Sequence, residues 1–453
     1  MSRKKPSVKE RQRVALHTAW KSVSSPEGKP KVGIEEFMSL SERWGFSKKT
    51  LKKIREALKE EDWGEGPFLV NYYSDVEESK VREYERTARE IFGTKHALGL
   101  SSGTAALHCA FVACGIGPGD EVICPAVGYV ATASSVILAG GTPVLCDVDE
   151  TLTLDPDRIE ELITDRTVAI APTPVMGNLC DMDSILKIAR KRHLRVIEDA
   201  AQSCGATYHG KWAGTLGDIG CFSIAAYKII GGGEGGLLLT NDKHLYERAQ
   251  QFSEGGGLWR ENRFGKAVQE GELFCGTNYR MSELEAALNV VQLRKMPGIV
   301  ERFRKVRDRV LKHLGDFEGI RLQPSHDYEG EMGYAIRFYP ETFDLGEKIV
   351  PDLQALGVRC GWIGREEWPD WHLASDMIEV LKRRDPQRFS GLHPERARTG
   401  TPRADDYYRR IVTVHLNQWM KAKDCKELAN QMNTVFSKYS GRHRDRGKKP
   451  TVR

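Results

Sequence analysis

Short apolar runs alternate with amphipathic segments between about residue 80 and residue 255. Runs of four or five apolar residues are typical of buried strands, whereas the segments between them carry apolar residues at helical spacing. This alternation predicts an α/β fold with a large, mostly parallel seven-stranded sheet and crossover helices. The expected strands are Ala97–Leu100, Glu121–Cys124, Pro143–Asp147, Val168–Pro172, Arg195–Glu198, Gly220–Ile224 and Gly236–Thr240. The expected helices include Thr104–Ala113, Ser184–Arg192 and Lys243–Ser253.

The first 65 residues show a different pattern and predict a helical N-terminal extension. Apolar residues recur at helical spacing in Ile34–Leu40 and in Leu51–Leu58. Ser47 is a suitable N-cap for the second of these helices, because its hydroxyl can accept a hydrogen bond from a first-turn amide. The glycine- and proline-containing stretch Trp63–Pro67 then predicts a break before the large sheet begins.

The rest of the chain predicts a second, smaller α/β domain. One long helix is expected from Met281 to about Leu314, and it connects a large domain at residues 66–300 to a small domain at residues 301–440. Within the small domain, residues 383–406 are rich in Arg, Pro and Asp and predict a long loop. Residues 441–453 predict a basic, disordered tail. A chain of 453 residues has room for all of these parts.

The distribution of charge and the spacing of cysteines disfavour a nucleic-acid-binding protein and a metal-binding protein. The formal net charge is only +5, and much of it lies at the two ends of the chain. Solvated, frayed tails explain this better than nucleic-acid binding. The 10 cysteines include no CxxC pair and no zinc-type spacing, so we expect a reducing cytoplasm and no metal site. No apolar stretch predicts a secretion signal or a membrane span.

A lysine, a serine and an aspartate carry the strongest chemical signal. Lys228 lies between a predicted strand and a glycine-rich turn, Ser223 precedes it by five residues, and Asp199 ends a predicted strand upstream. Pyridoxal phosphate needs an amine for its aldehyde, a carboxylate for its ring nitrogen and neutral donors for its phosphate. The three residues supply these groups in the expected order, and a surface lysine beside a glycine turn is the weaker interpretation.

A second phosphate-binding element is expected where Ser101–Leu107 follows a strand and opens a helix. Gly103 would allow a close backbone approach, Thr104 adds a hydroxyl, and the helix N-terminus presents free amides to an anion. Ordinary N-capping of a crossover helix explains this motif better when it is taken alone, because turns of small residues between a strand and a helix are common.

Three further side chains have both a functional and a structural interpretation. Tyr129 at a strand end can stack on a pyridine ring or lie at the edge of the core. Gln202 can hydrogen-bond the cofactor's phenolic oxygen or be a buried structural amide. Asn278, next to Arg280 before the long helix, suits a phosphate or carboxylate but also suits a capping turn.

Several long stretches together resemble the DegT/DnrJ/StrS aminotransferase family, whose members work mostly on keto-sugars. The matching stretches are SSGTAAL, GPGDEVICPAVGYVATASS, VIEDAAQSCGATYHGKWAGTLGDIGCFS, YKIIGGGEGG and NYRMSELEAAL. The resemblance covers about residues 66–300. It implies a fold-type-I, aspartate-aminotransferase-like structure, pyridoxal 5'-phosphate as cofactor, and a homodimer with active sites shared at the subunit interface.

The resemblance also assigns roles to the candidate residues. Lys228 falls on the Schiff-base lysine and Asp199 on the partner of the ring nitrogen. The phosphate ligands are Gly103, Thr104 and Ser223, the stacking aromatic is Tyr129, the residue near the phenolic oxygen is Gln202, and the asparagine that reaches the neighbouring subunit's phosphate is Asn278.

We therefore expect a PLP-dependent aminotransferase that moves an amino group from glutamate or glutamine to a keto- or aldehydo-sugar, nucleotide-linked or of the octulosonate type. Two alternatives stay open at this point. One is another fold-type-I enzyme, a lyase or desulfurase. The other is a regulator that keeps the fold and binds nucleic acid through its basic N-terminal extension.

Overall fold

A computed structural model describes residues 32–61, 79–256, 275–365, 369–384 and 400–441, together with Leu69. The break expected at Trp63–Pro67 and the two basic ends of the chain lie outside the described residues.

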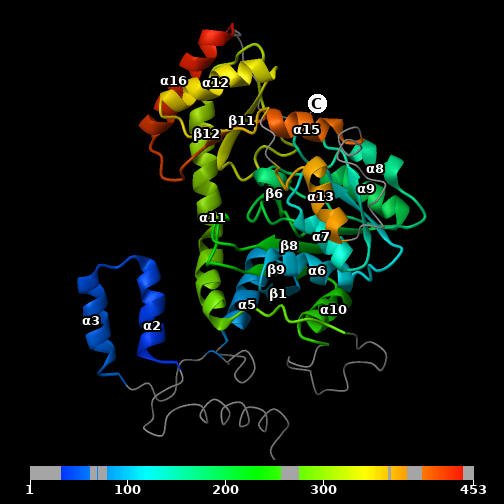
Figure 1. The fold of residues 1–453 in the computed structure, drawn as a ribbon, viewed down its shortest axis with the longest axis vertical. Helices are drawn as coiled ribbons and strands as arrows, with labels where there is room; N and C mark the ends of the chain where they lie inside the picture. Colours follow the sequence, from blue (N-terminus) through cyan, green and yellow to red (C-terminus); the bar gives the residue numbers. More distant parts are fainter. Residues whose placement is uncertain are drawn as a thin grey trace, which may run out of the picture.

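The core of the larger part is a seven-stranded sheet with the strand order β1-β9-β8-β5-β4-β2-β3 (Figure 1). Strand β9 runs antiparallel to β1 and β8, and all other neighbours are parallel. The mostly parallel sheet expected from the sequence is confirmed. Its strands are β1 (His96–Leu100), β2 (Glu121–Pro125), β3 (Thr142–Cys146), β4 (Thr167–Ile170), β5 (Arg195–Asp199), β8 (Ile219–Ser223) and β9 (Gly236–Thr240).

Helices cover both faces of this sheet. Helices α6 (Gly103–Ala113), α7 (Ala131–Leu138) and α10 (Lys243–Ser253) bury apolar residues against one face. The opposite face packs against α5 (Lys80–Phe92), α8 (Pro156–Leu162), α9 (Met182–Arg192) and the first half of α11 (Glu283–Leu311). Alternate residues of β9 point into the two cores, because successive strand side chains face opposite sides. The remaining short elements here are η2 (Val175–Gly177), β6 (Thr207–Tyr208) and β7 (Lys211–Trp212).

The expected N-terminal helices are present as α2 (Ile34–Ser41) and α3 (Lys48–Leu58), joined through η1 (Glu42–Trp44). Ser47 caps α3 as expected, since its hydroxyl accepts from the Thr50 amide at 3.2 Å. An ion pair between Arg55 and Glu35 joins the two helices, which lie beside the main body (Figure 1).

A four-stranded antiparallel sheet, the small sheet, forms beyond α11 in the order β10-β11-β13-β12. Ile336, Phe338, Val412 and Val414 bury one of its faces under α12 and α16. Helix α11 runs from the large sheet into this second core, where it contributes Val306 and Val310. The elements are β10 (Ile320–Leu322), β11 (Ala335–Pro340), α12 (Phe343–Ala355), β12 (Cys360–Gly361), β13 (Val412–His415) and α16 (Ala422–Tyr439).

The loop expected at residues 383–406 is wrong at both ends. Helix α13 (Ala374–Arg384) includes the first two of these residues, and α15 (Pro402–Arg410) includes the last five. Pro402 is tolerated because it occupies the first turn, where its missing amide would have no intrahelical partner. Ion pairs between residues four apart then support α15, including Arg410–Asp406 at 2.5 Å. Residues 385–399 lie outside the described part of the chain.

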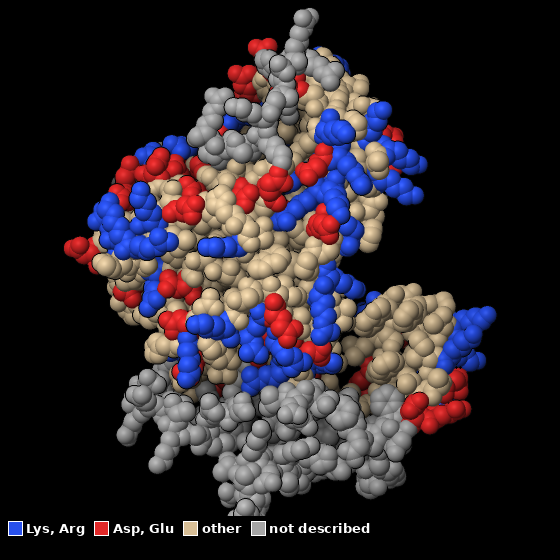
Figure 2. Space-filling view, turned by 180° about the vertical axis from the view of Figure 1, so that it is seen from behind, with Lys and Arg blue, Asp and Glu red and all other residues tan. Residues whose placement is uncertain are grey.

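Acidic and basic side chains are interspersed over the face seen in Figure 2. The ion pairs of the surface include Lys191–Glu160 at 2.7 Å. Within the described ranges, no helix combines the length and apolar character needed to cross a membrane.

Candidate active site

The candidate residues gather where β1, β5 and β8 end. These three strands share one direction, so their carboxyl ends lie at the same edge of the sheet. Ligands of open α/β sheets bind at this edge. The loop after β1 carries Gly103, β5 ends at Asp199, and β8 ends at Ser223.

The loop after β1 packs directly against the end of β8. Ser102 caps α6 by accepting from the Ala105 amide at 3.1 Å, and Thr104 lies exposed in the first turn. A Cβ atom on Gly103 would lie only 2.7 Å from the Ser223 Cβ. Only glycine therefore allows the helix N-terminus and the serine hydroxyl to approach each other so closely. Ser102 does cap α6, but capping alone does not require the close approach of Gly103 to Ser223.

Replacing Gly103 by alanine is expected to push Ser223 out of place and weaken cofactor binding by on the order of tenfold, about 1.4 kcal/mol. The measurement is the Kd of pyridoxal phosphate for the cofactor-free protein. Gly117→Ala is the matched control, because a Cβ there meets no atom within 4 Å. Equal affinities in both variants would contradict the role of this contact.

Asp199 is a buried carboxylate held by two donors. Its Oδ2 accepts from the Thr132 hydroxyl at 2.5 Å, and its Oδ1 accepts from the Ala201 amide at 3.2 Å. Burial raises the pKa of this carboxyl, and the two hydrogen bonds and the positive charge of Lys228 oppose that rise. The charge on Asp199 is therefore costly in the protein alone, and a bound cation at this position would stabilise it.

Lys228 lies partly buried in the turn after β8. Its backbone amide donates to the Ala225 carbonyl at 2.9 Å, and Gly231 approaches the same carbonyl closely. Desolvation lowers the pKa of the Lys228 amine, while the charge of Asp199 acts in the opposite direction. A lowered pKa increases the fraction of neutral, nucleophilic amine near neutral pH.

Tyr129 is fixed by a segment that the sequence did not connect with it. The amides on either side of it, of Gly128 and Val130, donate to the carbonyls of His372 and Trp371, both at 2.9 Å. The rings of Tyr129 and His372 lie 5.4 Å apart, and the His372 Nδ1 lies 2.7 Å from Asp370. Tyr129 itself is 43% exposed, so its ring face can receive a ligand.

The side-chain oxygen of Gln202 already accepts a hydrogen bond from the backbone. Its Oε1 accepts from the Met176 amide at 2.8 Å, and Met176 adopts a positive φ of 54° to present that amide. Because Oε1 accepts this hydrogen bond, the Nε2 group of Gln202 is the part of the amide that can donate to a ligand.

Asn278 lies in a segment that borders the loop between β1 and α6 of its own chain. The Ser101 amide donates to the Tyr279 carbonyl at 2.8 Å, and Asn278 Oδ1 accepts from the Arg280 amide at 3.3 Å. The residue that caps α11 is Ser282, whose hydroxyl accepts from the Glu285 amide at 3.2 Å. Asn278 therefore does not cap α11, and its hydrogen bond closes a local turn with Arg280.

One cavity of about 580 Å³ joins several of these groups to the small sheet. Its volume lies within the range of small-molecule sites. Lys228 and Gln202 line it together with side chains that the sequence reasoning missed or did not connect with the site. These are Phe303, Tyr334, Arg359, His372, His415 and Gln418.

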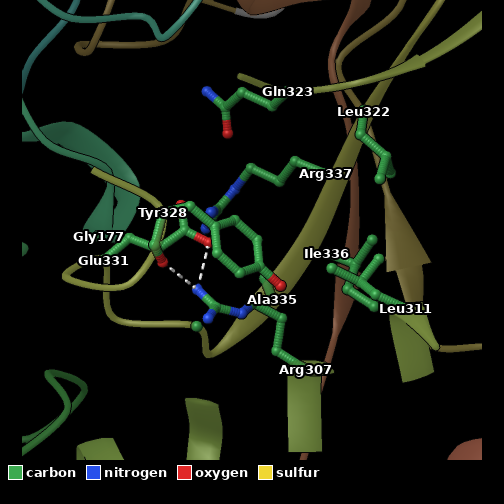
Figure 3. Close-up of a pocket in the computed structure, with 11 residues that line it drawn as sticks. Gly177, Arg307, Leu311, Leu322, Gln323, Tyr328, Glu331, Ala335, Ile336 and Arg337 are labelled. Atoms are coloured by element: carbon green, nitrogen blue, oxygen red, sulfur yellow. Dashed lines mark hydrogen bonds and ion pairs between the residues drawn. The ribbon is translucent and has the colours of Figure 1, made fainter. Parts of the chain in front are cut away.

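A second, much smaller cavity of about 30 Å³ surrounds Arg307 (Figure 3). Arg307 stacks on Tyr328 at 3.8 Å, and its NH1 donates to Glu331 at 2.6 Å. The space suffices for a single water molecule. This buried cluster fastens α11 to the loop that precedes β11, and we interpret it as structural.

The residues present at the sheet edge fit pyridoxal phosphate. The Gly103 approach leaves a cradle that a Cβ would fill, Thr104 and Ser223 add hydroxyls, and a buried carboxylate and an amine of lowered pKa complete the set. A fold of this type with this donor set is typical of PLP-dependent transferases.

The sequence pattern of the DegT/DnrJ/EryC1/StrS aminotransferase family matches residues 53–363, and the chain belongs to this family. The protein is thus a PLP-dependent aminotransferase, and the resemblance seen in the sequence is confirmed.

Named relatives agree with this assignment. The chain is 38% identical over 316 residues to the GDP-perosamine synthase of Caulobacter vibrioides, which covers 67% of this chain and 81% of that protein. It is 39% identical over 367 residues to the L-glutamine:2-deoxy-scyllo-inosose aminotransferase of Streptomyces lividus, covering 76% and 83%. An aminotransferase structure from Psychrobacter cryohalolentis superposes with a TM-score of 0.68 at 28% identity, covering 87% of this chain and 98% of that one.

Proposed function

We propose that the protein transfers an amino group from glutamate or glutamine to the carbonyl of a keto- or aldehydo-sugar, or of a sugar-like cyclic ketone, in amino-sugar biosynthesis. The observation that carries this proposal is the cavity that joins Lys228 to the polar side chains of the small sheet. Such a cavity suits a hydroxyl-rich acceptor. One relative is named for the synthesis of GDP-perosamine, and the other is named as an aminotransferase between L-glutamine and 2-deoxy-scyllo-inosose.

The chain's residues divide the chemistry among them. Bound pyridoxal phosphate supplies the aldehyde that carries the amino group and the ring that accepts electrons from the substrate C–H bond. The amine of Lys228 would hold the aldehyde, and the same amine would act as the base that takes and returns the proton at the substrate carbon. Asp199 keeps a proton on the ring nitrogen, because its buried charge is stabilised by that cation.

The remaining site residues bind and orient. Gly103, Thr104 and Ser223 hold the phosphate at the α6 N-terminus. Tyr129 would lie against the ring face of the bound cofactor, and Gln202 would donate its Nε2 group to the phenolic oxygen, because its Oε1 already accepts from the Met176 amide.

A panel of keto-sugars, free and nucleotide-linked, together with cyclitol ketones, tests the proposed reaction. With glutamate or glutamine as donor, we expect stoichiometric formation of an aminated acceptor and of the donor's 2-oxo acid. Release of ammonia, alanine or sulfide from amino acids without an acceptor would instead indicate a lyase or desulfurase. The presence of Lys228, Asp199 and Ser223 at one sheet edge disfavours a purely regulatory protein.

We further propose a homodimer in which Asn278 reaches the cofactor phosphate of the partner subunit. A two-fold interface would give two equivalent shared sites. Exposed apolar residues along α11, Leu284, Leu288 and Val291, support an interface beside this segment.

Mixing two inactive variants tests the shared site. Heterodimers of Lys228→Ala and Asn278→Ala chains should regain one intact site, and therefore about half of the wild-type activity per dimer. The measurement is turnover of heterodimers isolated through two different tags. Activity no higher than that of either parent homodimer would mean that Asn278 acts only within its own chain.

We propose that the protein works in the cytoplasm. All ten cysteines are free, and seven of them are buried, which suits a reducing compartment. We also propose the division into a helical extension, a large cofactor-binding domain at 66–300, a small domain at 301–440 and a basic tail.

A further inference from the structure

The small sheet turns a polar face away from its own core. Cross-strand pairs place Ala335 opposite His415 and Arg337 opposite Thr413. The residues between them, such as Ile336 and Val414, belong to the buried core under α12 and α16. Because side chains alternate along a strand, Arg337 and His415 share the other face.

Arg359 extends this polar face by one strand. The His415 amide donates to the Arg359 carbonyl at 2.8 Å, and the next residues along, Cys360 and Val414, form a cross-strand pair. The side chains of Arg359 and His415 therefore lie next to each other. Both line the cavity that contains Lys228 and Gln202.

Gln418 adds an oriented donor to the same cavity wall. The guanidinium of Arg302 donates twice to its Oε1, at 2.9 and 2.7 Å. This pairing fixes the amide and leaves Nε2 as the group that faces a ligand.

Of Arg359, His415 and Gln418, which line one side of the cavity, Arg359 is the charged residue. Desolvation, followed by the positive charges of Arg337 and Arg359, lowers the pKa of the His415 imidazole, so His415 is neutral at neutral pH. An arginine stays charged at every relevant pH. Arg359 is exposed to the cavity, and within the described ranges its guanidinium forms no hydrogen bond or ion pair. A guanidinium without an acidic partner in a cleft attracts an oxyanion.

We propose that Arg359, with His415 and Gln418, forms the subsite that binds an oxyanion of the substrate, either the carboxylate of the amino donor or a phosphate on the acceptor. The proposal rests on the proposed aminotransferase function and adds a specificity-determining residue to it. On this side of the cavity, the lining residues Arg359, His415 and Gln418 offer one fixed charge and two neutral groups, which matches a single anionic group flanked by hydrogen-bonding atoms.

Binding of inert anions to the cofactor-loaded protein tests the subsite, because the phosphate cradle is then filled. Calorimetry with succinate and with inorganic phosphate gives the two Kd values. Arg359→Met should weaken binding of at least one probe by on the order of tenfold or more, and Arg359→Lys should restore part of it. Arg158→Met, an exposed arginine on α8 that pairs with Glu161, is the matched control and should bind as wild type does.

Succinate and inorganic phosphate distinguish a subsite for the donor carboxylate from a subsite for a phosphate on the acceptor. Loss of succinate binding, with a raised glutamate KM and little change in kcat for formation of 2-oxoglutarate, assigns the subsite to the donor carboxylate. Loss of phosphate binding, with unchanged donor kinetics, assigns it to the acceptor. Wild-type affinity of Arg359→Met for both probes, or no binding of either by the wild-type protein, overturns the proposal.

Failure of the proposed aminotransferase reaction can be told apart from failure of the Arg359 subsite. Anion binding that depends on Arg359, combined with no turnover of any keto-sugar or cyclitol ketone, would remove the acceptor class and leave the subsite in place. Turnover of the panel with anion binding independent of Arg359 would remove the subsite alone.

Discussion

Lys228→Ala is expected to lower turnover by on the order of 10³ or more, because the variant lacks the amine that holds the cofactor aldehyde and moves the substrate proton. The fold should survive, since alanine removes a partly desolvated amine whose lowered pKa shows that its charge is disfavoured there. Turnover with glutamate and the thermal midpoint of unfolding are the two measurements. Lys243→Ala, an exposed lysine on α10, is the control and should behave as wild type.

Chemical trapping identifies the lysine directly. Borohydride reduction of the loaded wild-type protein, followed by a tryptic digest, should place the pyridoxyl group on Lys228. A label on any other lysine, or a Lys228→Ala variant that turns over at the wild-type rate, would refute the assignment.

Asp199→Asn is expected to slow proton removal from the substrate by on the order of 10² or more, while cofactor affinity falls much less. The amide fits the site, because its oxygen can accept from the Ala201 amide and its nitrogen can donate to the Thr132 hydroxyl. The neutral amide cannot hold the ring nitrogen protonated, so the loss is specific to that step. A deuterium effect on the α-carbon should become larger in the variant. An unchanged rate would show that this carboxylate is not the ring's partner.

The same substitution should stabilise the cofactor-free protein at neutral pH. Burial raises the folded-state pKa of Asp199 above its unfolded value. Below the unfolded pKa both states are protonated and no penalty exists; as the pH rises towards the folded pKa, ionisation increasingly favours unfolding. Urea unfolding should therefore show Asp199→Asn to be more stable than wild type at pH 7, by on the order of 1 kcal/mol, with the difference shrinking in acid. Equal stability at all pH values would contradict this.

The large sheet could be predicted because its signal is local. Strands such as β8 and β9 are buried almost throughout, so each appears in the sequence as a short run of mostly apolar and small residues. The cofactor-binding candidates were equally local, since Ser223 and Lys228 are five residues apart and Gly103 opens α6 three residues after the end of β1. A strand end or a helix start places such residues without knowledge of the whole fold.

The substrate side of the cavity could not be predicted in this way. Arg359, His415 and Gln418 meet Lys228 only because the small sheet faces the large one. Alternation in β13 shows which residues share a face, but it does not reveal what that face meets. His372 likewise reaches Tyr129 through backbone pairing between distant segments. The error at residues 402–406 had another cause, because proline and charged residues suit both a loop and the start of a helix.

Helix α11 limits where residues can be inserted into the chain or deleted from it. Its first turn follows the segment that borders the loop between β1 and α6, and further along the helix Arg302 donates to Gln418, which lines the cavity. An uninterrupted helix advances about 1.5 Å and turns about 100° for each residue. A single-residue insertion between Ser282 and Arg302 would therefore swing the guanidinium away from Gln418 and rotate Val306 out of the second core. Relatives that keep this architecture should vary in the lengths of their surface loops but not in the spacing between these two ends of the helix.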